Sequence, residues 1–197
     1  MKTLDVSGLP TYAYGHRSLM WWGTMGLMAI EGTVFAIALV TYFYFRELAD
    51  LWPTGSRPPS LLFGTINTLI LLVSAIPNQW TKKAAEREDL RAVRIGMTIC
   101  MALSIAFLIV RIFEFPALNT RWDLNAYGSI VFMLLGLHTA HLATDAIDSA
   151  VLTVLMFTGP LQGKRFVDVS ENALYWWFVV LSWLPIYFTI YIVPRWM

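Results

Sequence analysis

The sequence predicts an all-α polytopic membrane protein, a single membrane domain over residues 1–197 that forms a bundle of five transmembrane helices. Hydrophobic residues make up 57% of the chain and charged residues 14%, whereas soluble domains average about 45–50% and about 25%. The apolar runs are long enough to cross a bilayer, whose hydrocarbon core needs about 20 helical residues. Nothing in the composition suggests nucleic-acid binding.

The first predicted span covers residues 18–45, between Arg17 and Arg46. Its only charged residue is Glu31. Aromatic side chains gather at both ends of the span, as interfacial anchors do: Trp21, Trp22, Tyr42 and Tyr44. The next span, residues 61–80, follows a loop that contains Pro53, Gly55, Pro58 and Pro59. Proline and glycine at this density end a helix, so the two spans are separate.

A charged segment of mixed sign, residues 82–94, leads from the second span to the third and is expected to be a helical linker at the membrane surface. The third span, residues 95–115, ends on Arg111 and Glu114. These two residues lie three positions apart, so they share one helix face and can form an ion pair.

The fourth predicted span, residues 126–157, is longer than a bilayer core is thick, so we expect it to tilt or to protrude. A short loop with Lys164 and Arg165 should follow it, before the fifth span at residues 174–193. The polar lead of residues 1–16 is expected to lie along the membrane surface.

The basic residues predict the orientation of the five spans. With the amino terminus inside, nine basic residues lie in inner segments and four in outer segments, which favours N-in and C-out by the positive-inside rule. The inner residues are Lys2, Arg17, Lys82, Lys83, Arg87, Arg91, Arg94, Lys164 and Arg165, and the outer ones are Arg46, Arg57, Arg121 and Arg195.

Ionisable residues inside the spans are candidate functional residues, because a charge in the bilayer is costly. Within the fourth span they are spaced by three, four and three, which places them in one stripe: His138, His141, Asp145 and Asp148. A di-metal site would draw Glu-x-x-His pairs from further helices, and no second pair exists here. A pair of haem ligands is also an open interpretation, although His16 is the only other histidine. We favour a hydrogen-bonded stripe without metal ligands or catalytic residues.

Glu31 has two open interpretations. Burial in an apolar bundle favours the neutral form of a carboxyl group, which can then join helices by a hydrogen bond. A buried carboxyl group can also accept a proton at the edge of a proton path. The nearest candidate partner for Glu31 within the chain is the stripe of the fourth span.

Several short motifs follow one another along residues 17–194. They are Met28-Ala-Ile-Glu31-Gly-Thr-Val-Phe35, Asn67-Thr68, Arg111-Ile-Phe-Glu114-Phe115, Tyr127-Gly128-Ser129, Gly136-Leu-His138-Thr-Ala-His141, and Tyr175-Trp176-Trp177-Phe178-Val179 with Trp183. In this order they resemble subunit III of the haem–copper oxidases (cytochrome c oxidases), in its short five-helix bacterial form. The chain departs from the family pattern at Trp177 and Val180, where the family has His and Asp, at Arg111, where it has Gln, and in the added acids Asp145 and Asp148.

The resemblance implies a subunit without redox centres in the bacterial inner membrane. It would bind beside subunits I and II, which carry the haems and copper, hold phospholipid and support proton uptake, and a larger respiratory supercomplex is a further candidate partner. Two alternatives stay open. One is an accessory subunit of a quinol oxidase or a nitric oxide reductase. The other is a self-contained proton-coupled transporter that uses Glu31, His141 and Asp145.

Overall fold

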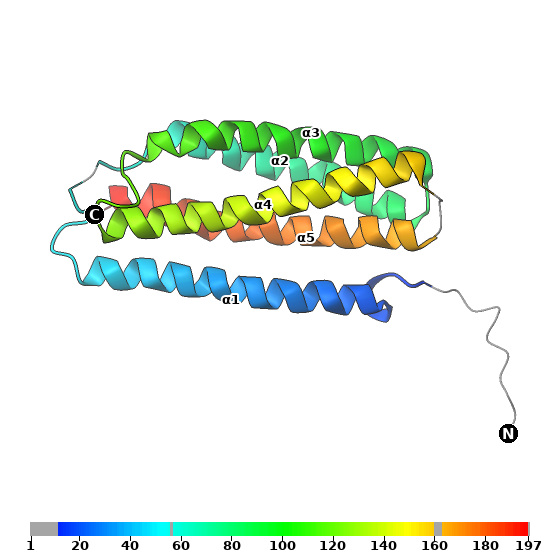
Figure 1. Cartoon of the computed structure of the whole chain (residues 1–197), viewed down its shortest axis with the longest axis horizontal. Coiled ribbons are helices and arrows are strands. Elements are labelled where there is room, and N and C mark those ends of the chain that lie inside the picture. Colours follow the sequence, from blue (N-terminus) through cyan, green and yellow to red (C-terminus); the bar gives the residue numbers. More distant parts are fainter. Residues whose placement is uncertain (1–11, 56, 160–162, 197) are drawn as a thin grey trace, which may run out of the picture.

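Long helices run along the longest axis of the molecule (Figure 1). The computed structural model describes residues 12–55, 57–159 and 163–196. The helices are α1 (Leu19–Glu47), α2 (Leu61–Glu86), α3 (Leu90–Glu114), α4 (Ala126–Thr158) and α5 (Gly163–Tyr187), and α5 continues through a π-helical turn (Phe188–Ile192) and a 3-10 turn (Val193–Arg195). Five segments are long and apolar enough to cross a membrane, and the described residues contain no strand. The predicted all-α architecture with five spans is confirmed.

The predicted loop with Lys164 and Arg165 was wrong, because α5 begins at Gly163 and includes both residues. Its first turns are amphipathic: Phe166, Val167 and Val169 are buried beneath a polar face. Average hydropathy does not detect such a segment, so the prediction began this helix at residue 174.

The segment predicted as a helical linker, residues 82–94, is helical except at residues 87–89, but it belongs to the two flanking helices rather than to a separate linker. Helix α2 continues to Glu86 and α3 begins at Leu90, so only a tight turn separates them. The side chain of Asp89 caps α3 by accepting a hydrogen bond from the Ala92 backbone nitrogen at 3.1 Å. This cap explains how the helix starts directly after the turn.

Helix α4 has 33 residues and is therefore about 50 Å long at 1.5 Å per residue. That length exceeds the hydrocarbon core of a bilayer, about 30 Å. Figure 1 shows α4 inclined relative to α5, its neighbour in the bundle.

Helix α1 lies at the edge of the bundle, against α4 and α5 (Figure 1). Its buried residues are only Phe35, Ala38 and Tyr42. The other helices enclose a core of large side chains that includes Trp183, Phe107 and Tyr127. Most of the α1 surface is therefore available to lipid or to a partner chain.

The segment before α1 contacts the turn between α2 and α3. The Tyr12 hydroxyl donates a hydrogen bond to Glu88 Oε1 at 2.9 Å, and the Tyr14 hydroxyl donates to the Ala85 carbonyl at 3.2 Å. Burial and the nearby Glu88 carboxylate raise the pKa of Tyr14. Residues 1–11, which include Lys2 and most of the lead expected at the membrane surface, lie outside the described residues.

Candidate functional site

Glu31 meets side chains of α4 and α5 near the middle of α1. Its Oε1 lies 3.5 Å from His141 Nε2, and its Oε2 accepts a hydrogen bond from the Tyr175 hydroxyl at 2.7 Å. The side chains of Glu31 and His141 are 20% and 13% exposed. We call Glu31, His141 and Tyr175 the central cluster.

The ring nitrogens of His141 have different partners. His141 Nδ1 lies 2.7 Å from the Leu137 carbonyl oxygen, which can only accept, so Nδ1 carries a proton. Nε2 can then accept a proton from a neutral Glu31, or carry one itself and face a Glu31 carboxylate. Both states have the same net charge. The 3.5 Å separation exceeds a usual hydrogen bond of about 2.7–3.2 Å, so proton transfer requires the two side chains to approach each other.

Asn172 of α5 joins the two aspartates of α4. Its amide Nδ2 donates to Asp145 Oδ1 and to Asp148 Oδ2, each at 3.2 Å. Its carbonyl oxygen accepts a hydrogen bond from the Ser149 hydroxyl at 3.1 Å. Asp145 is 3% exposed, and its Oδ2 has no hydrogen-bond partner in the described parts of the chain. We call Asp145, Asp148 and Asn172 the acidic cluster.

A cavity of about 660 Å³ between α1, α4 and α5 connects the two clusters. Glu31 and Tyr175 lie at the end nearer the bundle centre, and Arg165 and Asp168 lie where α5 begins. The acidic cluster lines the wall between them. The cavity thus places ionisable groups at successive depths, from the end of the bundle to Glu31.

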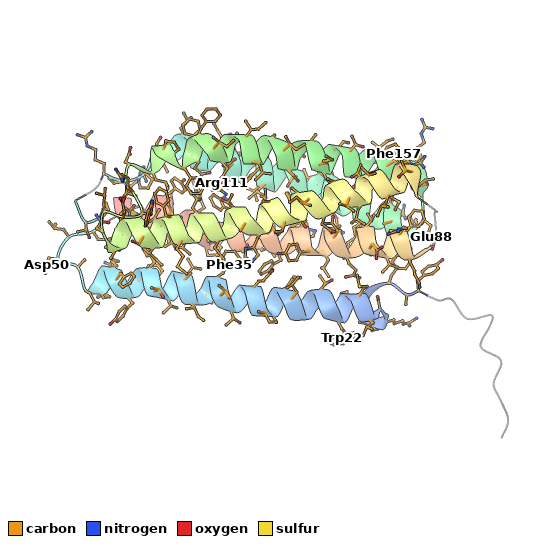
Figure 2. The ribbon with its side chains drawn as sticks, in the orientation of Figure 1. Trp22, Phe35, Asp50, Glu88, Arg111 and Phe157 are labelled. Carbon is orange, nitrogen blue, oxygen red and sulfur yellow. The ribbon has the colours of Figure 1, made fainter. Side chains whose placement is uncertain are left out.

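Arg111 and Glu114 lie inside the bundle, and Figure 2 shows Arg111 between α3 and α4. Arg111 Nη1 and Glu114 Oε2 are 2.9 Å apart, and each residue is 1% exposed. Their contact is an ion pair by distance, but it is not aligned as a hydrogen bond. Glu114 also accepts hydrogen bonds from Asn67 of α2 and from the Tyr191 hydroxyl, the latter at 2.5 Å. These residues join α2, α3 and the π-helical turn that follows α5.

The guanidinium group of Arg111 also lies over two aromatic rings, at 4.6 Å from the Phe107 ring centre and 4.4 Å from that of Trp183. Stacking of this kind attracts the cation to the ring faces. The charge of Arg111 is thus compensated by Glu114 and by aromatic electrons rather than by water.

Both ring nitrogens of His138 are engaged in the core. Its Nε2 lies 3.0 Å from the Val179 carbonyl oxygen and must donate, so its Nδ1 accepts from Arg111 Nη2 at 3.3 Å. These contacts fix one neutral tautomer. In the residues that the structure describes, no three His, Cys, Asp or Glu side chains come together as metal ligands.

The predicted stripe on α4 is divided among three neighbouring helices. His138 meets Arg111 of α3, His141 meets Glu31 of α1, and the aspartates meet Asn172 of α5. Sequence reasoning missed Asn172 as a member of the site. Its spacing of three from Tyr175, which places both on one face of α5, is the signal that could have found it.

Replacing Asn172 by leucine should destabilise the bundle by about 1–3 kcal/mol, because the buried Asp145 carboxyl group loses the one donor that the described residues give it. Thermal unfolding of the detergent-solubilised protein would measure the loss. Thr144→Val is the matched control, since that exposed hydroxyl donates, among the described residues, to carbonyls of its own helix alone. Equal stability of the two variants would contradict a structural role for the amide.

Comparison with known proteins identifies a family. A family model for cytochrome c oxidase subunit III matches residues 46–195. A cytochrome c oxidase subunit 3 of Thermostichus vulcanus is 24% identical over 187 residues, 93% of this chain and 92% of that protein. A probable cytochrome c oxidase subunit 3 of Mycobacterium tuberculosis is 28% identical, over 87% of this chain and 86% of its own length. A heme-copper oxidase subunit I+III of Aeropyrum pernix is 25% identical, over 88% of this chain and 22% of that protein.

Proposed function

The chain belongs to the cytochrome c oxidase subunit III family, and on this premise we propose that it stabilises the catalytic subunit I of a haem–copper oxygen reductase and supports its proton uptake. Membership of the family makes it a multi-pass membrane protein that associates with other oxidase subunits. The oxygen chemistry would belong to haems and copper in the partner subunits.

Subunits I and II are the partners that we propose. The Aeropyrum pernix relative carries the designation I+III in a single chain, which supports close contact between those two parts. The large apolar residues that α1 exposes, among them Ile30, Ile37 and Val40, offer a surface for such a contact. A larger respiratory supercomplex would add contacts beyond these.

The proposed location is the bacterial inner membrane, with the amino terminus in the cytoplasm. The excess of nine basic residues over four supports this orientation. It would make the end of the bundle where α1 and α5 begin the cytoplasmic end. The cavity that leads to Glu31 would then open toward the side from which an oxidase takes up protons.

The central cluster is the observation that carries the proposal of proton uptake. Glu31 and His141 can hold one proton in either of two positions without a change in net charge, and Tyr175 donates to the same carboxyl group. Chains of acidic and histidine side chains in membrane proteins mark proton relays. The acidic cluster, along the same cavity, supplies further proton-binding groups between Glu31 and the end of the bundle.

The Glu31→Gln variant of the intact oxidase tests this role. Glutamine keeps an acceptor for Tyr175 but cannot exchange a proton at working pH. We expect normal assembly, with several-fold slower proton uptake or several-fold fewer turnovers before activity is lost. Oxygen consumption with proton release, followed over many turnovers in reconstituted vesicles, is the measurement.

Glu47→Gln is the matched control for that variant, because Glu47 lies at the far end of the same helix with its side chain 73% exposed. It should behave as the wild type. Wild-type kinetics in Glu31→Gln would contradict the proton role. Purification of the chain without any haem-absorbing partner would contradict the oxidase assignment and favour a self-contained transporter.

A further inference from the structure

A second site lies on the opposite side of α4 from the central cluster. A groove of about 580 Å³ runs between α3 and the end of α4. Its volume falls within the range of small-molecule sites, roughly 300–1,000 Å³. The lining residues include two arginines and no acid: Leu90, Arg91, Arg94, Ile95, Thr98, Ile99 and Phe157. We propose that this groove binds an anionic phospholipid of the phosphatidylglycerol type.

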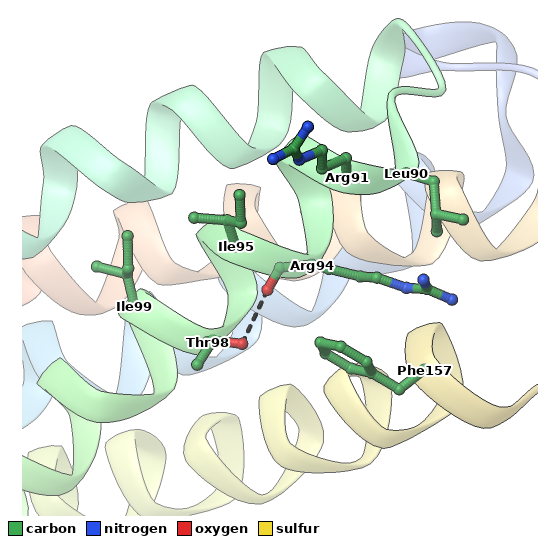
Figure 3. Close-up of a pocket in the computed structure, with 7 residues that line it drawn as sticks. All are labelled: Leu90, Arg91, Arg94, Ile95, Thr98, Ile99 and Phe157. Atoms are coloured by element: carbon green, nitrogen blue, oxygen red, sulfur yellow. Dashed lines mark hydrogen bonds between the residues drawn. The ribbon is translucent and has the colours of Figure 1, made fainter.

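The arginines lie at the end of the groove that coincides with the end of the bundle. Helix α3 begins at Leu90, so Arg91 and Arg94 occupy its first turns, where a lipid phosphate would lie. Figure 3 shows the Arg94 side chain extended over Phe157, and its guanidinium carbon is 5.0 Å from the ring centre. The α4 residue thus holds one arginine across the mouth of the groove.

Donors of both arginines remain available to a ligand. Arg94 uses its Nε to donate to the Met156 carbonyl oxygen at 2.9 Å, which leaves both terminal nitrogens without a protein acceptor in the described residues. Arg91 is exposed and has no hydrogen bond or ion pair with the described residues. Guanidinium groups bind phosphate oxygens through paired hydrogen bonds.

The nearby acids accept hydrogen bonds from other groups and form no ion pair with Arg91 or Arg94 in the described residues. The Asp89 side chain caps α3 at the Ala92 backbone nitrogen. The Glu88 carboxylate accepts from Tyr12. The guanidinium groups of Arg91 and Arg94 therefore keep donors for an anionic headgroup, as in the basic pockets between transmembrane helices that bind anionic lipids.

Below the arginines the groove is apolar and open to the side. Ile95 and Ile99 lie one and two turns deeper along α3 and are 47% and 42% exposed, and Phe157 on the facing helix is 54% exposed. Thr98 satisfies its hydroxyl by donating to the Arg94 carbonyl at 2.8 Å (Figure 3). A single acyl chain fits this order of charge above and hydrocarbon below, whereas a free phosphate ion would leave the apolar part unused.

This inference rests on the lipid binding expected of the family and specifies the headgroup and the place. The test uses the intact oxidase reconstituted in vesicles that contain phosphatidylglycerol with a photoreactive diazirine in one acyl chain. Peptide mapping should find labels around Ile95, Ile99 and Phe157. A phosphatidylcholine probe of the same chain length should label these peptides far less.

Arg91→Gln should lower the labelling about fivefold, the effect of removing one charge near an anionic headgroup. It keeps every hydrogen bond of the described residues, so misfolding does not obscure the result. Arg94→Gln should lower the labelling at least as much. Arg87→Gln is the matched control, since Arg87 caps α2 beside the same turn but does not line the groove, and it should label as the wild type.

Equal labelling by the two probes, or unchanged labelling in Arg91→Gln, would overturn the proposal, because acyl chains would then enter the groove without headgroup recognition. Displacement of the probe by inorganic phosphate beyond the effect of chloride at equal ionic strength would assign the site to a free anion and would also overturn it. Labelling is read without turnover, so its failure is distinguishable from a failure of the Glu31 experiment.

Discussion

Replacing Glu114 by leucine is expected to destabilise the bundle by about 3–5 kcal/mol, because Arg111 then keeps a buried charge without its partner. The carboxylate also accepts from Asn67 and Tyr191, and these donors would lose their acceptor as well. Equilibrium unfolding of the purified chain in mixed detergent micelles, together with the thermal stability of the complex, would measure the loss.

A double variant separates the cost of leaving the Arg111 charge without a partner from the other losses of stability in Glu114→Leu. Arg111→Met with Glu114→Leu leaves no buried charge, so it should be more stable than Glu114→Leu alone. Asp123→Asn is the exposed control. The pKa of Asp123 is held below its usual range by hydrogen bonds from Arg121, but both side chains are exposed, at 38% and 70%. Its replacement should have no measurable effect on stability.

If Arg111→Met with Glu114→Leu were as unstable as Glu114→Leu alone, compensation of the Arg111 charge would not be the role of Glu114.

Trp183→Ala is expected to cost about 3–5 kcal/mol, the usual range for removing a buried aromatic side chain. Trp183 is fully buried, and its ring centre lies 4.9 Å from that of His138 and 6.3 Å from that of Phe107. Its loss would open a cavity beside the Arg111 guanidinium group. Lipid tails are as apolar as the core, so the loss reflects packing and stacking rather than exposure to water.

Trp183→Phe is the graded control for that cavity. Phenylalanine keeps an aromatic ring over Arg111 but removes the indole N–H, which donates to Thr68 Oγ1 at 2.8 Å. The expected cost is about 1 kcal/mol for the lost hydrogen bond, plus a small packing loss. Alanine and phenylalanine variants of equal stability would contradict the role of the ring, and the same unfolding measurement would decide.

The positions of the charged residues along the helices could be predicted from the sequence, but most of their partners on other helices could not. Arg111 and Glu114 lie three positions apart on one helix, so local geometry alone predicted that they could pair, and the structure holds them 2.9 Å apart. Their nearly complete burial was not predicted, because both lie near the end of an apolar run. The packing of α2, α4, α5 and the π-helical turn after α5 against α3 encloses them.

Hydropathy by itself determined the class of the protein, its five spans and the presence of an acid, Glu31, in the middle of the first. A helix that crosses a bilayer must satisfy its backbone hydrogen bonds within its own segment and must be apolar over its length. Each span is therefore recognisable from its own run of residues. The tertiary structure decided that Glu31 meets His141 and Tyr175, that the α4 stripe is shared among three helices, and that α5 begins early. The period of a helix fixes which residues share a face, but which neighbour that face meets depends on packing between segments as far apart as the 144 positions from Glu31 to Tyr175.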